Sequence, residues 1–163
     1  MNDEALEERA TGGILLATDG SEHAAAALAV GLRLVDPGLD RLLVTVVPAV
    51  DPMMMVGGGH SGAVMTPFEG ESLIEEREAG AQVVLDGTLA ALAESGTSVD
   101  SIDTMILWGD PGSEICRHAA EQAVEAIVLG TSGRGGLKRA FLGSVSDHVV
   151  RHAHCPVVTV NED

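Results

Sequence analysis

Five short apolar runs alternate with segments of helical character along the 163 residues, and this alternation constrains the fold more than any other feature. Short, continuous apolar runs are typical of strands that are buried on both faces, as in a parallel sheet. A right-handed crossover between parallel strands carries each intervening helix back over one face of the sheet. The sequence therefore predicts an α/β fold: an open parallel sheet with helices on both faces. The runs occupy residues 13–18, 42–47, 101–107, 126–129 and 156–160.

Capping residues and helix breakers place four helices between these runs. Ser21 is a candidate N-cap, and the Asp36-Pro37-Gly38 sequence is expected to end the first helix. The run at 101–107 alternates polar and apolar residues, which is typical of a strand near a sheet edge. The expected helices run from Ser21 to the stop at Asp36, from 68 to 92, from 113 to about 124 and from 144 to 152.

The length corresponds to about one domain, so we expect residues 1–163 to form a single domain. Residues 1–11 are predicted to be a mobile tail. Residues 48–66, rich in Gly, Pro and Met, show neither a helical nor a strand period and are predicted to be a mobile loop. No apolar run approaches the roughly 18 residues that a membrane span needs, and no leader pattern opens the chain. We therefore expect a cytoplasmic protein that does not contact a membrane.

The charge balance is strongly acidic. Asp and Glu number 25 against 9 Lys and Arg, which gives a formal net charge of −16. Such a field repels polyanions, so nucleic acid is not an expected partner. A mean hydropathy of +0.23 alongside this charge suggests an acidic surface over an aliphatic core. Salt screens the self-repulsion of such a surface, and we expect a halophilic protein; an acidic protein of ordinary salinity is the alternative.

The sulfur and imidazole side chains give weaker signals. Cys116 and Cys155 lack CxxC spacing and are expected to be buried thiols of a reducing compartment. Four possible metal ligands lie within eight residues: His148, His152, His154 and Cys155. A metal site formed by them is an alternative, but the sequence contains no second cluster that would complete the ligand set. The favoured interpretation has no metal bound by the protein.

Ligands of open α/β sheets bind beyond the carboxyl ends of the strands. At the end of the fourth run, Gly130-Thr131-Ser132-Gly133 is followed by nine residues and then by Gly143-Ser144 at the start of a helix. Glycines allow close approach of backbone N–H groups to an anion, and Ser144 adds a hydroxyl where the helix dipole favours negative charge. This pattern predicts a phosphate-binding site.

Other phosphate and nucleophile motifs are absent or misplaced. Lys138 follows Leu137 rather than a glycine, so there is no Walker A loop. The G-x-G-x-x-G spacing at residues 57–62 lies far from its strand and helix, and we treat it as a false positive.

Three positively charged residues lie within a stretch of six residues in the 130–144 segment: Arg134, Lys138 and Arg139. A bound triphosphate would need positive charge here; a solvated loop with scattered cations is the alternative.

From Ile14 to Val160 the chain resembles the universal stress protein family, of the ATP-binding type. The G-x2-G-x9-G-[S/T] motif of that family is met in full by Gly130, Gly133, Gly143 and Ser144. The resemblance implies a five-stranded parallel sheet in the order 3-2-1-4-5. This sequence departs from many family members at Ala17 and His154, where they have Pro, and in its longer 48–66 loop.

The resemblance also implies roles for single residues. Asp19 and the backbone of Val46 would bind adenine, and Gly130 would lie against the ribose. The remaining motif residues Gly133, Gly143 and Ser144 would contact the phosphates. Arg134 is added to this predicted site on its positive charge and not on the resemblance. A carboxylate such as Asp19 can accept the exocyclic amine of adenine. Asp19 could instead only hold the turn before the first helix.

Three functions fit these observations. The favoured one is a nucleotide-dependent regulatory switch in a stress response, which binds ATP with Mg²⁺ or Mn²⁺ and has at most weak ATPase activity. The second is an enzyme that hydrolyses or transfers nucleotides, for which Ser144 and Asp110 are the candidate groups. The third is a scaffold without nucleotide. An apolar final strand at a sheet edge also predicts a homodimer through Pro156–Val160, and the signalling partner is unknown.

Overall fold

The computed structural model describes residues 12–49, 67–131 and 142–161 of the chain. These residues form a five-stranded, wholly parallel sheet in the order β3-β2-β1-β4-β5. The predicted architecture and strand order are confirmed, and so is the edge position of the strand with alternating polarity, β3. The strands are β1 (Ile14–Ala17), β2 (Arg41–Val47), β3 (Ile102–Trp108), β4 (Ala126–Gly130) and β5 (Val157–Val160).

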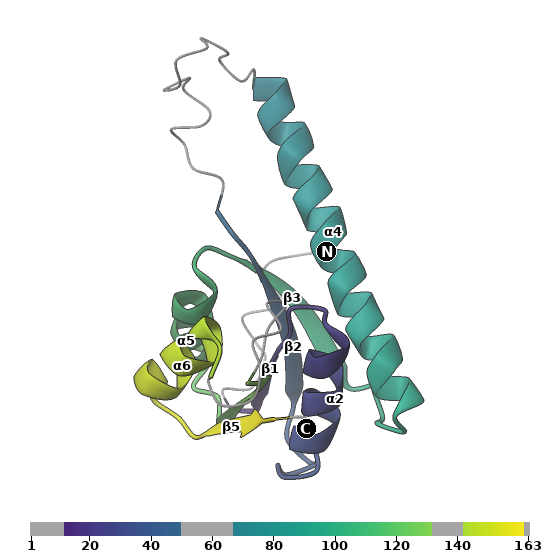
Figure 1. Cartoon of the computed structure of the whole chain (residues 1–163), viewed down its shortest axis with the longest axis vertical. Helices are drawn as coiled ribbons and strands as arrows, with labels where there is room; N and C mark the ends of the chain where they lie inside the picture. The colour runs from purple at the N-terminus through teal and green to yellow at the C-terminus, as the bar shows by residue number, and fades with distance from the viewer. Residues whose placement is uncertain (1–11, 50–66, 132–141, 162–163) are drawn as a thin grey trace.

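Two helices cover each face of the sheet (Figure 1). The first face packs against α2 (Glu22–Gly31) and the 28-residue α4 (Pro67–Glu94). The second face packs against α5 (Pro111–Glu121) and α6 (Ser144–His152). No helix within the described part of the chain is long and apolar enough to cross a membrane.

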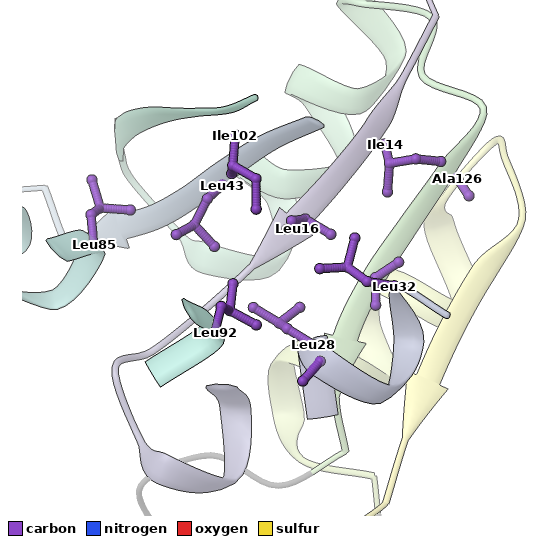
Figure 2. Packing of buried hydrophobic residues seen from close by; sticks show 11 residues of the cluster. Ile14, Leu16, Leu28, Leu32, Leu43, Leu85, Leu92, Ile102 and Ala126 are labelled. Carbon is purple, nitrogen blue, oxygen red and sulfur yellow. The ribbon is translucent and has the colours of Figure 1, made fainter. Parts of the chain in front are cut away.

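Consecutive residues of β1 explain why the strands are apolar without alternation. Leu16 points into the cluster under α2 and α4, where it meets Leu28, Leu43 and Leu92 (Figure 2). Leu15, one residue earlier, points into the cluster under α5 and α6, and both side chains are fully buried. A strand in the middle of a two-sided sheet has no polar face, so a continuous apolar run is what burial requires.

The first helix is shorter than its sequence pattern predicts. Ser21 caps it as expected, accepting a hydrogen bond from Ala24 N, but α2 ends at Gly31 rather than near Asp36. Val35 and Leu39 pack against the core from the turns that follow the helix. Their apolar character therefore reflects burial and does not indicate that the helix continues. After Gly31 the hydrogen bonds change to i→i−3, with Arg33 N donating to Val30 O and Leu34 N donating to Gly31 O, so the α-helix tightens into a turn and ends there.

The third helix also ends early, at Glu121 instead of about residue 124. Ala123 has φ +47°, and Val124 N donates to Ala119 O while Ala123 N donates to Ala120 O. This left-handed turn closes the helix in a position where glycine is usual.

The prediction that both cysteines are buried is only partly right. Cys116 and Cys155 are partly buried, at the border of the second hydrophobic cluster.

Candidate functional site

A cleft of about 1050 Å³ opens at the carboxyl ends of β1, β2 and β4. Its size is that of a small-molecule site, and its position is where open α/β sheets bind ligands. The described lining residues come from the three strand ends, one face of α4, and the first turns of α2, α5 and α6. They include Ala17, Thr18, Asp19, Val44, Thr45, Val46, Val47, Pro48, Arg77, Gly80, Ala81, Val84, Pro111, Ile115, Leu129, Gly130, Leu142, Gly143, Ser144, Val145 and Ser146.

Asp19 occupies the turn between β1 and α2 at one side of the cleft. Its Oδ1 accepts hydrogen bonds from Ser21 N at 3.0 Å and from Ser21 Oγ at 2.7 Å. Ser21 Oγ in turn accepts from Ala24 N at 3.1 Å, which caps α2. The turn-holding role considered for Asp19 is therefore present, and the same carboxylate lines the cleft.

A buried threonine pair supports this turn from below and was not found by sequence reasoning. Thr18 Oγ1 accepts from Gly20 N at 3.1 Å and lies 3.1 Å from Thr88 Oγ1. Thr88 Oγ1 donates to Val84 O at 2.9 Å, so the proton between the two hydroxyls comes from Thr18. Gly20 has φ +80°, and a Cβ there would meet Val84 at 2.9 Å. The α4 helix thus fixes the turn that carries Asp19.

The start of α6 forms the other side of the cleft. Gly143 is its N-cap residue and offers no side-chain cap, while Gly143 N donates to Thr131 O at 2.7 Å. Ser146 Oγ lies within hydrogen-bond distance of Thr131 O (3.1 Å) and Gly143 O (3.0 Å). Gly130, Gly143 and Ser144 therefore come together at the cleft, where the positive end of the α6 dipole faces it.

Some of the predicted phosphate-site residues lie outside the described residues, namely Gly133, Arg134, Lys138 and Arg139. Most of the 48–66 loop lies outside them as well. Val46 lines the cleft from within β2, where it pairs with Leu107 of β3. Among the described lining residues, the positively charged one is Arg77 of α4, which sequence reasoning missed. Its Nη1 donates to Pro48 O at 2.9 Å, so α4 is tied to the end of β2.

Asp110, the second carboxylate considered for chemistry, has a structural role. Its Oδ2 accepts from Ser113 N at 3.0 Å and from Ser113 Oγ at 2.8 Å, which caps α5. These hydrogen bonds stabilise the ionised form and lower the pKa of Asp110 below its ordinary value. Asp110 does not appear among the described lining residues, so it is a weaker candidate for a general base than sequence position suggested.

The histidines of α6 stack on one another. The rings of His148 and His152 are 4.2 Å apart, and His152 Nδ1 lies 2.8 Å from His148 O. In the described ranges, no three His, Cys, Asp or Glu side chains gather as they would around a metal ion.

His118 of α5 is the buried titratable group that sequence reasoning overlooked. It is 6% exposed, and its Nε2 has no hydrogen-bond partner in the described structure. Burial lowers the pKa of His118, because the charged imidazolium loses its hydration.

These features define a doubly wound α/β domain whose cleft joins a carboxylate-bearing turn to an uncapped helix start. The universal stress protein family matches residues 12–161, and the chain belongs to that family. A Thermus aquaticus universal stress protein is 37% identical over 90% of this chain and 96% of its own length. YxiE of Bacillus subtilis is 32% identical over 90% of this chain and 97% of its length. A shorter match, 44% identical over 61 residues, covers 36% of Methanocaldococcus jannaschii MJ0531 and 37% of this chain.

Solved structures share the fold. An Arabidopsis thaliana family protein with AMP bound has a TM-score of 0.55 and 18% identity, covering 93% of this chain and 92% of that one. An Archaeoglobus fulgidus protein in complex with dAMP has a TM-score of 0.51 and 20% identity, covering 91% and 96%. A universal stress protein in complex with cAMP has a TM-score of 0.61 and 17% identity, covering 94% and 99%. At these identities the likeness concerns the fold alone.

Proposed function

We propose that this protein binds ATP in the cleft at the carboxyl ends of β1, β2 and β4. The observation that carries the proposal is the start of α6, where Gly143 leaves the first turn without a side-chain cap and Ser144 lines the cleft. Backbone N–H groups at such a helix start favour an anion such as phosphate. Nucleotides bound to three proteins of the same fold support this ligand class.

The proposed contacts follow the two sides of the cleft. Asp19 and the backbone of Val46 bind adenine, Gly130 lies against the ribose, and Gly143 and Ser144 hold phosphates. A carboxylate accepts up to about four hydrogen bonds, so holding the turn and accepting the adenine amine are compatible roles for Asp19. Gly133 belongs to this proposal on its place in the glycine motif, and Arg134 on its positive charge next to it. Mg²⁺ or Mn²⁺ would accompany the triphosphate as its counterion.

A regulatory switch is favoured over an enzyme. A hydrolase needs a general base within reach of the attacking water. Asp19 is the one His, Cys, Asp or Glu among the described lining residues, and its carboxylate already holds the β1–α2 turn on the side opposite α6. We propose a cytoplasmic protein in which ATP stabilises one conformation and at most weak turnover occurs. The scaffold alternative, without nucleotide, is disfavoured by the complete glycine motif.

We further propose a homodimer through the segment 156–160. β5 is an edge strand, and its four residues are half-buried in the single chain. A second copy across a two-fold axis would pair the open edge, which otherwise exposes unpaired backbone groups. Sedimentation at micromolar concentration and high salt tests this; a monomer would contradict it.

Calorimetry with ATP, with and without Mg²⁺ or Mn²⁺, tests the nucleotide site. Ser144→Ala should lose about 1 kcal/mol of binding free energy, about fivefold in affinity, because one hydroxyl donor to phosphate is removed. Ser95→Ala, at the far end of α4, is the matched control and should bind as the parent does. Absence of ATP binding by the parent would overturn the proposal. Rapid phosphate release would place the enzyme hypothesis ahead of the switch.

A further inference from the structure

One face of α4 forms a wall of the cleft that the glycine motif does not account for. Arg77, Gly80, Ala81 and Val84 all line the cleft. Their spacing of three, four and seven residues places them on a single side of the helix. Figure 1 shows α4 continuing past the carboxyl end of the sheet, so this side lies alongside the end of β2. The wall is fixed at both ends, by the bond from Arg77 to Pro48 O and by the Val84 contact with Gly20.

Gly80 is the unusual member of this wall. A glycine inside a helix costs about 1 kcal/mol of stability relative to alanine. Packing within the described residues does not demand that cost here, because a Cβ at Gly80 would meet none of their atoms within 4 Å. The position opens into the cleft instead. The missing side chain therefore widens the cleft at this point and serves no packing contact in the described structure.

The wall lies on the side of the sheet opposite to the phosphate end. α4 packs with α2 on the first face, and α6 packs on the second. Gly143 and Ser144 start α6, whereas the α4 wall stands beside the ends of β1 and β2, where Asp19 and Val46 lie. Apolar and small side chains suit the flat face of an aromatic ring, and an arginine guanidinium stacks on such a ring.

We propose that the nucleobase of the bound nucleotide lies against the α4 wall, and that the absence of a side chain at Gly80 sets the size of base that fits. This inference rests on the proposed nucleotide-binding function and assigns Gly80 and Arg77 to base recognition. A side chain at position 80 fills the space that a purine needs, while a pyrimidine, being smaller, tolerates it better.

The test compares Gly80→Leu with Gly87→Leu. Gly87 lies two helical turns further along α4, is exposed as Gly80 is, and likewise has no described atom within 4 Å of a built Cβ, but it does not line the cleft. Both substitutions replace a helix-interior glycine by a good helix former, so neither should lower the melting temperature. Dissociation constants for ATP and CTP are measured by calorimetry for the parent and both variants.

Gly80→Leu should weaken ATP binding by about tenfold or more and lower the ratio of ATP to CTP affinity, while Gly87→Leu leaves both unchanged. Parent-like ATP binding by Gly80→Leu would overturn the inference and leave the nucleotide site standing. An equal loss of ATP and CTP would overturn the placement of the base. If the parent protein binds no nucleotide, the proposed function fails and this inference fails with it.

Discussion

Replacing Thr88 by valine removes one hydroxyl from the buried pair beneath the Asp19 turn. Thr18 and Thr88 are 8% and 3% exposed, so water has little access to the place of the lost hydroxyl. Thr18 Oγ1 keeps the bond from Gly20 N, but its own proton loses its acceptor. A buried donor without a partner costs about 1–3 kcal/mol, whereas the shapes of Thr and Val match closely. We expect Thr88→Val to destabilise the fold by about 1–2 kcal/mol.

A double-mutant cycle isolates this effect. In a Thr18→Val background there is no Thr18 hydroxyl that could lose its acceptor. Thr88 Oγ1 still donates to Val84 O in that background. Adding Thr88→Val to that background should therefore cost close to zero, which gives a coupling energy of about 1–2 kcal/mol. Urea unfolding of the four proteins measures it, with the exposed Thr104→Val on β3 as a control for the chemistry of the exchange.

The reasoning would be refuted if Thr88→Val cost the same in both backgrounds, since the two hydroxyls would then be energetically independent. The cycle also bears on function. Thr18→Val removes the acceptor of Gly20 N, next to Asp19, so it should weaken ATP binding more than Thr88→Val does. Calorimetry on the same four proteins provides that comparison.

Three further predictions concern stability. Ala123→Gly should stabilise the protein by about 1 kcal/mol in urea unfolding, because Ala123 has φ +47° and glycine adopts that conformation without steric cost; an unchanged midpoint would contradict this. His118 has a lowered pKa in the fold, so the unfolded chain binds its proton first and stability falls as pH drops below about 6.5. His118→Leu should shrink the loss of stability between pH 7.5 and pH 5.5, and an equal loss in both proteins would show that His118 is not responsible. The melting temperature should rise from low to molar potassium chloride, since salt screens a net charge of −16; a flat or falling profile would remove the halophilic interpretation.

The sequence by itself determined the fold class and the position of one side of the cleft. Strands such as the one at 126–129 are buried on both faces of the sheet, so both of their faces must be apolar. The sequence shows this directly, because polar and apolar residues do not alternate along the run. The spacing from Gly130 to Gly143-Ser144 placed a glycine-bearing strand end and a helix start together, because the carboxyl ends of parallel strands share one edge. Ser21 is a local signal, and the helix cap that it predicted is present.

Only the tertiary structure decided the contributions of α4. Thr88, Arg77 and Gly80 are surrounded by ordinary helical sequence, and nothing in their local pattern says that they face β1, Pro48 or the cleft. The helix ends at Gly31 and Glu121 were also missed, because Val35 and Val124 are apolar for reasons of packing and not of helical period. Local signals such as caps and strand burial depend on neighbours in sequence. The α4 contacts depend on residues as far apart as Thr18 and Thr88, which come together only when the sheet is assembled.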